Sequence, residues 1–147
     1  MVDQRLFEQA FTLSQATGAA VERELEGVGL PTALFGLLSQ IRRHAPVAPT
    51  RISAITGTPL TTLRDNIQRL VDRGLVERTP NPADGRSYLL APTDRGELLA
   101  RAAGEPLQRA YAALESRLPR PLAEYQDAFD ELLEAMEGVL AQEQAVR

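Results

Sequence analysis

Residues 50–96 read TRISAITGTPLTTLRDNIQRLVDRGLVERTPNPADGRSYLLAPTDRG, and this stretch determines the expected fold. A short helical segment over 51–56 runs into the break Gly57-Thr58-Pro59, where the proline suits the first position of a helix. Apolar residues spaced close to 3.6 apart then predict an amphipathic helix over 59–73, with Thr58 as its N-cap. Two helices joined by a tight turn are therefore expected.

Gly74 is the type of residue that commonly ends a helix in the left-handed conformation. Short strands are expected over 75–78 and 87–90, because turn-forming residues fill 81–85 between them. Thr93 is placed to cap the helix that follows. The order helix, turn, helix and hairpin predicts a winged helix-turn-helix, in which the hairpin is the wing.

Further helices flank this stretch on both sides. Helical periodicity covers 2–26 and 31–44 before it, and 97–118 and 122–144 after it. Gly104 and Pro106 are expected to kink the first of the two later helices, since proline removes a backbone donor from the helix.

The whole chain, 1–147, is short enough for a single domain. We expect a mainly α fold with a small β-hairpin wing, in which residues 31–96 form the winged helix-turn-helix lobe. Residues 1–30 and 97–147 are expected to form a helical dimerisation region. The apolar faces of these terminal helices are wide for the ends of a small domain, so they predict burial against a partner.

The composition excludes several classes of site. The chain has no cysteine and one histidine, so disulfides and thiolate metal sites are excluded, and no metal or cofactor is expected. No run of 18 apolar residues and no secretory leader is present, which predicts a cytoplasmic protein without a membrane partner. An enzyme is not expected, since no cluster of catalytic side chains is apparent.

The charge is unevenly distributed along the chain. Residues 41–95 hold nine arginines and five acids, for a net charge of +4, whereas the other residues hold seven arginines and fifteen acids, for −8. The chain as a whole therefore carries −4. A basic module within an acidic frame is typical of a protein that meets phosphate on one surface.

The helix over 59–73 has a polar face suited to reading base edges in the major groove. Arginine pairs with guanine, glutamine pairs with adenine, and threonine contacts the thymine methyl group or a phosphate. At the hairpin tip Arg86 is suited to the narrow minor groove, with its side chain held by Asp84. The residues expected to contact DNA are Thr58, Thr61, Thr62, Arg64, Asp65, Gln68, Arg73, Arg78, Asp84, Arg86 and Arg51.

Each of these assignments has a simpler alternative. The polar face could be an ordinary solvated helix surface, and Asp84-Gly85-Arg86 could be a plain turn with a surface arginine. The expected phosphate contacts Arg51, Arg73 and Arg78 could equally be partners in surface ion pairs.

Residues 52–96 resemble the MarR family of bacterial transcription regulators. The matching pieces are Gly74-Leu75-Val76-x-Arg78, the wing tip Asp84-x-Arg86 and Thr93-x-x-Gly96. The chain departs from the family pattern at Gly85, where a second arginine is usual, and at Ala91-Pro92, which displaces the usual leucine.

This resemblance implies a homodimer whose first and last helices interlock, with each lobe on half of a pseudo-palindromic operator in double-stranded DNA. It also implies a regulator, most often a repressor, that is released when a small aromatic or phenolic ligand binds between the dimer helices and the lobe. The alternatives are a winged-helix module that binds another protein without binding DNA, and a PadR-like regulator.

The candidate ligand residues are Phe35, Leu38, Arg42 and His44, on the helix over 31–44, where Arg42 and His44 lie at its end. A cation at this position would suit an anionic ligand. The simpler interpretation is that the basic residues complement the helix dipole and that the apolar ones belong to the core.

Overall fold

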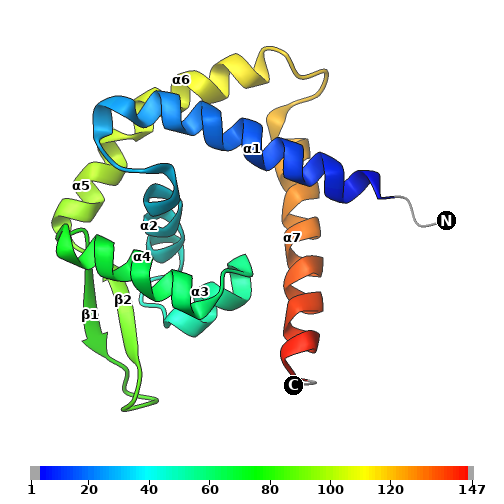
Figure 1. The fold of residues 1–147 in the computed structure, drawn as a ribbon. Coiled ribbons are helices and arrows are strands. Elements are labelled where there is room, and N and C mark those ends of the chain that lie inside the picture. The colour runs from blue at the N-terminus through cyan, green and yellow to red at the C-terminus, as the bar shows by residue number, and fades with distance from the viewer. Residues whose placement is uncertain (1–3, 146–147) are drawn as a thin grey trace.

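The computed structural model describes residues 4–145. Its elements in chain order are α1 (Arg5–Leu25), the short 3-10 helix η1 (Glu26–Val28), α2 (Thr32–His44), α3 (Pro49–Thr56), α4 (Leu60–Asp72), β1 (Val76–Pro80), β2 (Tyr88–Pro92), α5 (Asp94–Ala102), α6 (Gly104–Glu115) and α7 (Leu122–Ala145). Figure 1 shows α2 to α5 and the hairpin gathered into one body, which we call the lobe. The helices α1, α6 and α7 extend around one side of it, and we call them the frame.

The hydrophobic core lies in the lobe, and α2 runs through its centre. This helix packs on α4, β2 and α5, and α3 closes the core beside α4. The buried side chains are Leu30, Leu34, Leu37, Leu38, Ile41, Val47, Ile52, Leu63, Ile67, Leu70, Leu75, Val76 and Leu90. This core confirms the mainly α fold with a hairpin wing and fixes how the wing is attached to the helices.

The two strands pair in antiparallel register, with Val76 opposite Pro92 and Pro80 opposite Tyr88. Both strands begin one residue later than expected, at Val76 and Tyr88. For β1 the reason is that the amide of Leu75 donates to Leu70 O and so belongs to the end of α4. Before α3, Val47 exchanges two backbone hydrogen bonds with Leu90, at 3.1 and 2.8 Å. The base of the wing is therefore tied to the lobe on both sides.

Two sequence-based expectations about helix starts need correction. Pro59, with φ −55° and ψ 139°, is the N-cap of α4, so Thr58 is not. The hydroxyl of Thr58 instead bonds to that of Thr56, and its carbonyl accepts from Ser53 Oγ. The expected helix over 97–118 is two helices, α5 and α6, because Pro106 has no N–H to donate at the join after Ala102.

The end of α4 is joined to the start of α5 by the Thr93-x-x-Gly96 motif. Gly74 has φ +67° and ends α4, as expected. The hydroxyl of Thr93 donates to Gly74 O at 2.6 Å and accepts from the amide of Gly96 at 3.1 Å. The expected cap on α5 is confirmed, and the same hydroxyl fastens this helix to the turn after α4.

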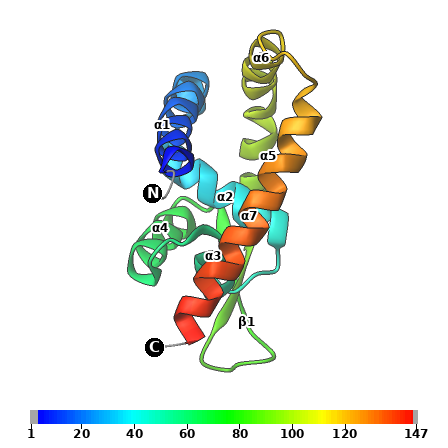
Figure 2. The same cartoon turned by 90° about the vertical axis from the view of Figure 1, so that its right-hand side faces the viewer.

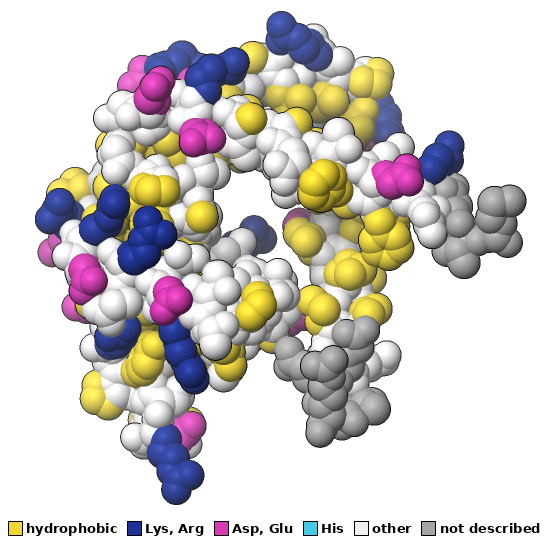
Figure 3. Space-filling model, viewed as in Figure 1, with side chains coloured by type: hydrophobic (Ala, Val, Ile, Leu, Met, Phe, Trp, Pro, Cys, Tyr) yellow, Lys and Arg dark blue, Asp and Glu magenta, His cyan; other side chains and the backbone are white. Residues whose placement is uncertain are grey.

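The frame contributes little to the core. Leu25 is the buried residue of α1, and α6 buries none. The exposed large apolar side chains of the frame are Leu6, Phe7, Phe11, Leu13, Tyr111, Leu114, Phe129, Leu132, Leu133, Met136 and Val139. Figure 3 shows apolar side chains gathered along α6 and on the facing sides of α1 and α7. Figure 2 shows α1 and α6 above the lobe, where the two helices contact each other. None of the helices within residues 4–145 is both long and apolar enough to cross a membrane.

Candidate nucleic-acid interface

One face of α4 is buried and the opposite face is open. Leu63, Ile67 and Leu70 pack into the lobe, and Leu60 and Val71 are partly buried against the same core. The exposed polar positions of the helix point away from it. The expected base-reading residues Thr61, Thr62, Arg64, Asp65 and Gln68 are all exposed. The structure thus brings these five side chains onto one accessible helix, as the sequence predicts.

At the hairpin tip, one amide side chain and one carboxylate accept hydrogen bonds from the backbone. Asn81 Oδ1 accepts from the amide of Ala83, and Asp84 Oδ1 accepts from the amide of Arg86, each at 3.0 Å. Asp84 was expected to hold the guanidinium of Arg86, so that expectation is corrected: the carboxylate holds the backbone. Within residues 4–145 the Arg86 guanidinium has no hydrogen-bond or ion-pair partner, and Figure 3 shows a basic side chain at the end of the wing.

Arg78 and Gln68 are in contact with each other. Arg78 Nη2 donates to Gln68 Oε1 at 2.9 Å, and Gln68 Nε2 donates to Asp72 Oδ1 at 2.7 Å. The Arg78 guanidinium also lies over the Tyr88 ring, 4.9 Å from its centroid. These two residues connect α4 to the wing.

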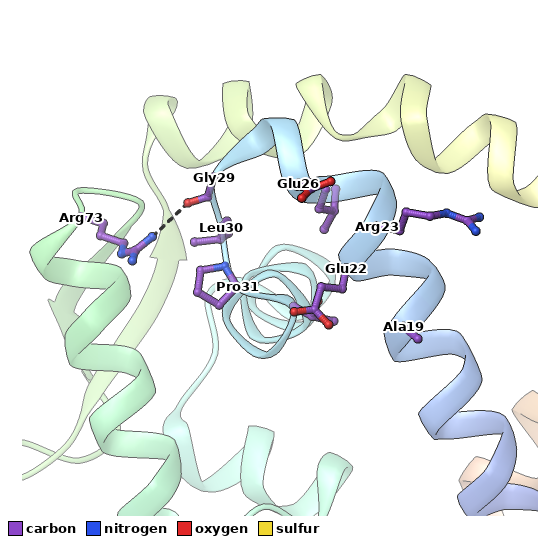
Figure 4. Close-up of a pocket in the computed structure, with 10 residues that line it drawn as sticks. Ala19, Glu22, Arg23, Glu26, Gly29, Leu30, Pro31 and Arg73 are labelled. Atoms are coloured by element: carbon purple, nitrogen blue, oxygen red, sulfur yellow. Dashed lines mark hydrogen bonds between the residues drawn. The ribbon is translucent and has the colours of Figure 1, made fainter.

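Two of the expected phosphate contacts lie elsewhere. Arg51, on α3, forms an ion pair with Glu137 of α7. Arg73 Nη1 donates to Gly29 O at 3.4 Å, so this side chain faces the loop between η1 and α2. Figure 4 shows Arg73 at the edge of an open pocket of about 660 Å³ beside the end of α1. Neither arginine joins the exposed face of α4.

The four candidate ligand residues are also separated by the structure. Phe35 lines a cavity of about 590 Å³ bounded by α1, α2, α6 and α7. Leu38 is fully buried in the core, and His44 does not line this cavity. Arg42 Nε and Nη2 donate to the two carboxylate oxygens of Glu97, at 3.1 and 3.0 Å, so its guanidinium is already paired.

The ion pair between Arg42 and Glu97 makes the stability of the lobe depend on pH. The hydrogen bonds from Arg42 lower the pKa of Glu97 below its ordinary value of 4.5, and the charges of Arg42 and Arg101 act in the same direction. A carboxylate whose folded pKa is lowered stabilises the protein above its unfolded pKa, and this stabilisation is lost as pH falls through the folded pKa.

Glu97→Gln is therefore expected to be less stable than wild type at neutral pH and to lose less stability on acidification. Urea denaturation from pH 7 down to pH 3 measures both effects. Arg42→Gln should remove the same pH dependence, because it removes the main cause of the shift. Identical pH profiles for Glu97→Gln and wild type would contradict the pairing.

The structure adds residues that were not singled out in the sequence. Glu97 and Glu137 lie 55 and 86 residues from their arginine partners, and no local pattern links them. Asp72 is four residues after Gln68, a spacing that places two side chains together on a helix, so this contact could have been found.

Comparison with protein families gives a match over residues 28–87 to the model described as the MarR family. A curated relative is the multiple antibiotic resistance protein MarR of Escherichia coli K12, which is 31% identical over 84 residues. That segment covers 57% of this chain and 58% of the relative, so the chain spans little more than half of the relative's length.

Solved structures share the fold over most of the chain. A mutant MarR from E. coli complexed with operator DNA has a TM-score of 0.75 at 24% identity, covering 88% of this chain and 94% of that one. A SlyA-like transcription regulator from Listeria monocytogenes has a TM-score of 0.80 at 19% identity, covering 99% and 96%. At these identities the likeness establishes the winged-helix fold with its flanking helices.

Proposed function

Because this chain belongs to the MarR family, we propose that it represses transcription by binding double-stranded DNA as a homodimer. The observation that carries the proposal is the Arg86 guanidinium at the end of the wing, which has no hydrogen-bond or ion-pair partner within residues 4–145. The wing extends from the same lobe as α4, whose polar side chains are exposed. In this arrangement α4 enters the major groove and the wing reaches the adjacent minor groove. The relative solved with operator DNA has the same fold.

The exposed apolar side chains of the frame support the homodimer. Phe11 of α1 and Leu133 of α7 are 66% and 62% exposed, and α6 has no buried residue. Apolar surface of this extent is typical of an interface, and a two-fold axis would cover the same faces of both copies. Two recognition helices related by that axis suit a pseudo-palindromic operator with half-sites about one helical turn apart.

Arg86→Ala is expected to weaken operator binding by about 1–3 kcal/mol, because it removes the proposed minor-groove contact. The measurement is a titration of the preferred duplex, selected from a random pool by the wild-type protein, at low and physiological salt. Arg117→Ala is the matched control, since Arg117 is exposed just after α6 and donates to Ala113 O in the last turn of that helix. It removes the same charge away from the wing and should bind like wild type.

A winged-helix module that binds another protein is the competing function. It predicts that the wild-type protein selects no preferred duplex and that Arg86→Ala changes nothing. Affinity that stays constant as salt rises would also count against DNA, because phosphate contacts release counterions.

We also propose that a small aromatic or phenolic ligand releases the DNA. The cavity beside Phe35 has aromatic lining from Tyr111 and Phe129, and the described residues that line it carry no charge. Thr32 Oγ1 is buried at this cavity without a hydrogen-bond partner among the described residues. Since Arg42 is paired with Glu97, the cavity suits a neutral phenol better than the anion that the sequence suggested.

Gly36→Leu is expected to prevent this release. Gly36 lies within α2 and lines the cavity, and a Cβ added to it would meet nothing within 4 Å. A leucine would therefore occupy the cavity and also favour the helix, by about 1 kcal/mol relative to glycine. DNA release by phenol and by benzoate, measured on wild type and on the variant, checks this. Equal release by phenol from both proteins would place the ligand elsewhere.

A further inference from the structure

We propose that Gln68 positions the wing and does not read a base, and that it does so through Arg78. This inference rests on the proposed DNA binding and assigns a new role within it. Asp72, Gln68, Arg78 and Tyr88 form a continuous set of contacts, which we call the α4–wing brace.

Both ends of the Gln68 amide are engaged in the free protein. Its oxygen accepts from the Arg78 guanidinium at 2.9 Å, and its nitrogen donates to the Asp72 carboxylate at 2.7 Å. A bidentate pair with adenine needs one acceptor and one donor of the same amide. The oxygen keeps a second acceptor position and the nitrogen a second hydrogen. Hydrogen bonds to charged groups are stronger than those between neutral groups, so these two partners fix the amide plane, and a base would have to fit that orientation or compete with them.

Arg78 connects this amide to both strands of the wing. It lies on β1, opposite Leu90, and its guanidinium stacks on the ring of Tyr88, two residues earlier on β2. Diagonal neighbours on one face of a hairpin are within reach of long and aromatic side chains. The brace therefore joins α4 to β1 and β2 beyond the last buried residues of the strands.

Besides the polar contacts of the brace, the outer part of the wing is held by the ring of Tyr88, which is partly buried against the core. Val76 and Leu90 are the buried residues of the two strands, and Glu77 to Pro80 are exposed. An isolated two-stranded hairpin is at best marginally stable in water. The direction in which the wing presents Arg86, relative to α4, is therefore set by the brace.

Arg64 provides a matched contrast on the same face of α4. It lies one helical turn before Gln68, is exposed, and has no hydrogen-bond or ion-pair partner within residues 4–145. Arg64 is thus free to read a base, and its contribution should be independent of the wing.

The test is a double-mutant cycle on the duplex that the wild-type protein selects from a random pool. Arg86→Ala should cost roughly 5- to 150-fold in affinity in the wild-type background. In the Gln68→Ala and Arg78→Ala backgrounds, Arg86→Ala should reduce the affinity about threefold or less. The wing is already misdirected in these backgrounds, so Arg86 contacts the DNA little before it is replaced. In the Arg64→Ala background the full cost should remain. All variants change exposed residues, so each should melt close to wild type.

Two further readouts separate positioning from base reading. A new selection with Gln68→Ala should return the wild-type consensus, whereas one with Arg64→Ala should relax it at one position. Without DNA, amide hydrogen exchange over residues 79–88 should be faster in Gln68→Ala than in wild type.

A consensus that changes with Gln68→Ala, or an additive cycle with Arg86→Ala, would overturn the brace while leaving DNA binding intact. Unchanged exchange in the wing would overturn it as well. A wild-type protein that selects no duplex would overturn the proposed function together with this inference.

Discussion

Replacing Gly96 with alanine is expected to destabilise the protein by about 3 kcal/mol or more. A Cβ at this position would lie 2.1 Å from Leu75 O and 3.1 Å from Leu75 C. Both are backbone atoms of the segment that joins α4 to β1, so no side-chain rotation can relieve the overlap. The first turn of α5 would have to move away from the lobe.

Gly96→Ala would also disturb the joint made by Thr93. Its hydroxyl bonds to Gly74 O and to the amide of Gly96, so moving α5 breaks contacts with the end of α4. Equilibrium unfolding in urea measures the loss. Gly138→Ala in α7 is the control, because a Cβ there would meet nothing within 4 Å. That variant should be unchanged or more stable by up to about 1 kcal/mol. Wild-type stability in Gly96→Ala would contradict the close approach of α5 to β1.

Replacing Leu133 with glutamate is expected to convert the proposed dimer into a monomer. Leu133 is 62% exposed on α7, within the apolar surface of the frame. Burying an ionised carboxylate without a partner costs far more than leaving it in water, typically several kcal/mol. The interface would therefore lose most of its affinity.

Light scattering at micromolar concentration distinguishes the two states of this variant. The control is Glu131→Gln, which alters an exposed charged residue two positions earlier on the same helix. It should keep the wild-type mass. A dimeric Leu133→Glu would show that α7 lies outside the interface, and a monomeric wild type would remove the dimer from the proposal.

The features that the sequence predicted well depend on neighbouring residues. Gly74 ends α4 because a left-handed residue is needed there, and Thr93 caps α5 through an amide three residues ahead. The error at Thr58 has a local cause as well. The fixed φ of proline suits both the N-cap and the first helical position, so Pro59 could take either, and its ψ of 139° makes it the cap.

The partners of the arginines could not be predicted in the same way. Arg42, Arg51 and Arg73 each contact an element far away in the sequence, so their roles depend on how the helices pack. The local sequence around an arginine on a helix is the same whether its guanidinium contacts a phosphate, a carboxylate or a carbonyl. Packing therefore narrows the expected DNA surface to α4, Arg78 and the wing tip.

The contact between Arg51 and Glu137 bears on how a salt titration of DNA binding should be interpreted. The two side chains are 54% and 31% exposed and join the lobe to α7. An exposed pair of this kind contributes at most about 1 kcal/mol and weakens as ions screen it. In the proposed complex, added salt thus acts on two electrostatic contacts in opposite ways. It weakens the binding of DNA, and it frees a guanidinium on α3 for a phosphate. The measured slope of DNA affinity against salt concentration is then the sum of these two opposing effects. The number of phosphate contacts calculated from that slope would therefore be too small.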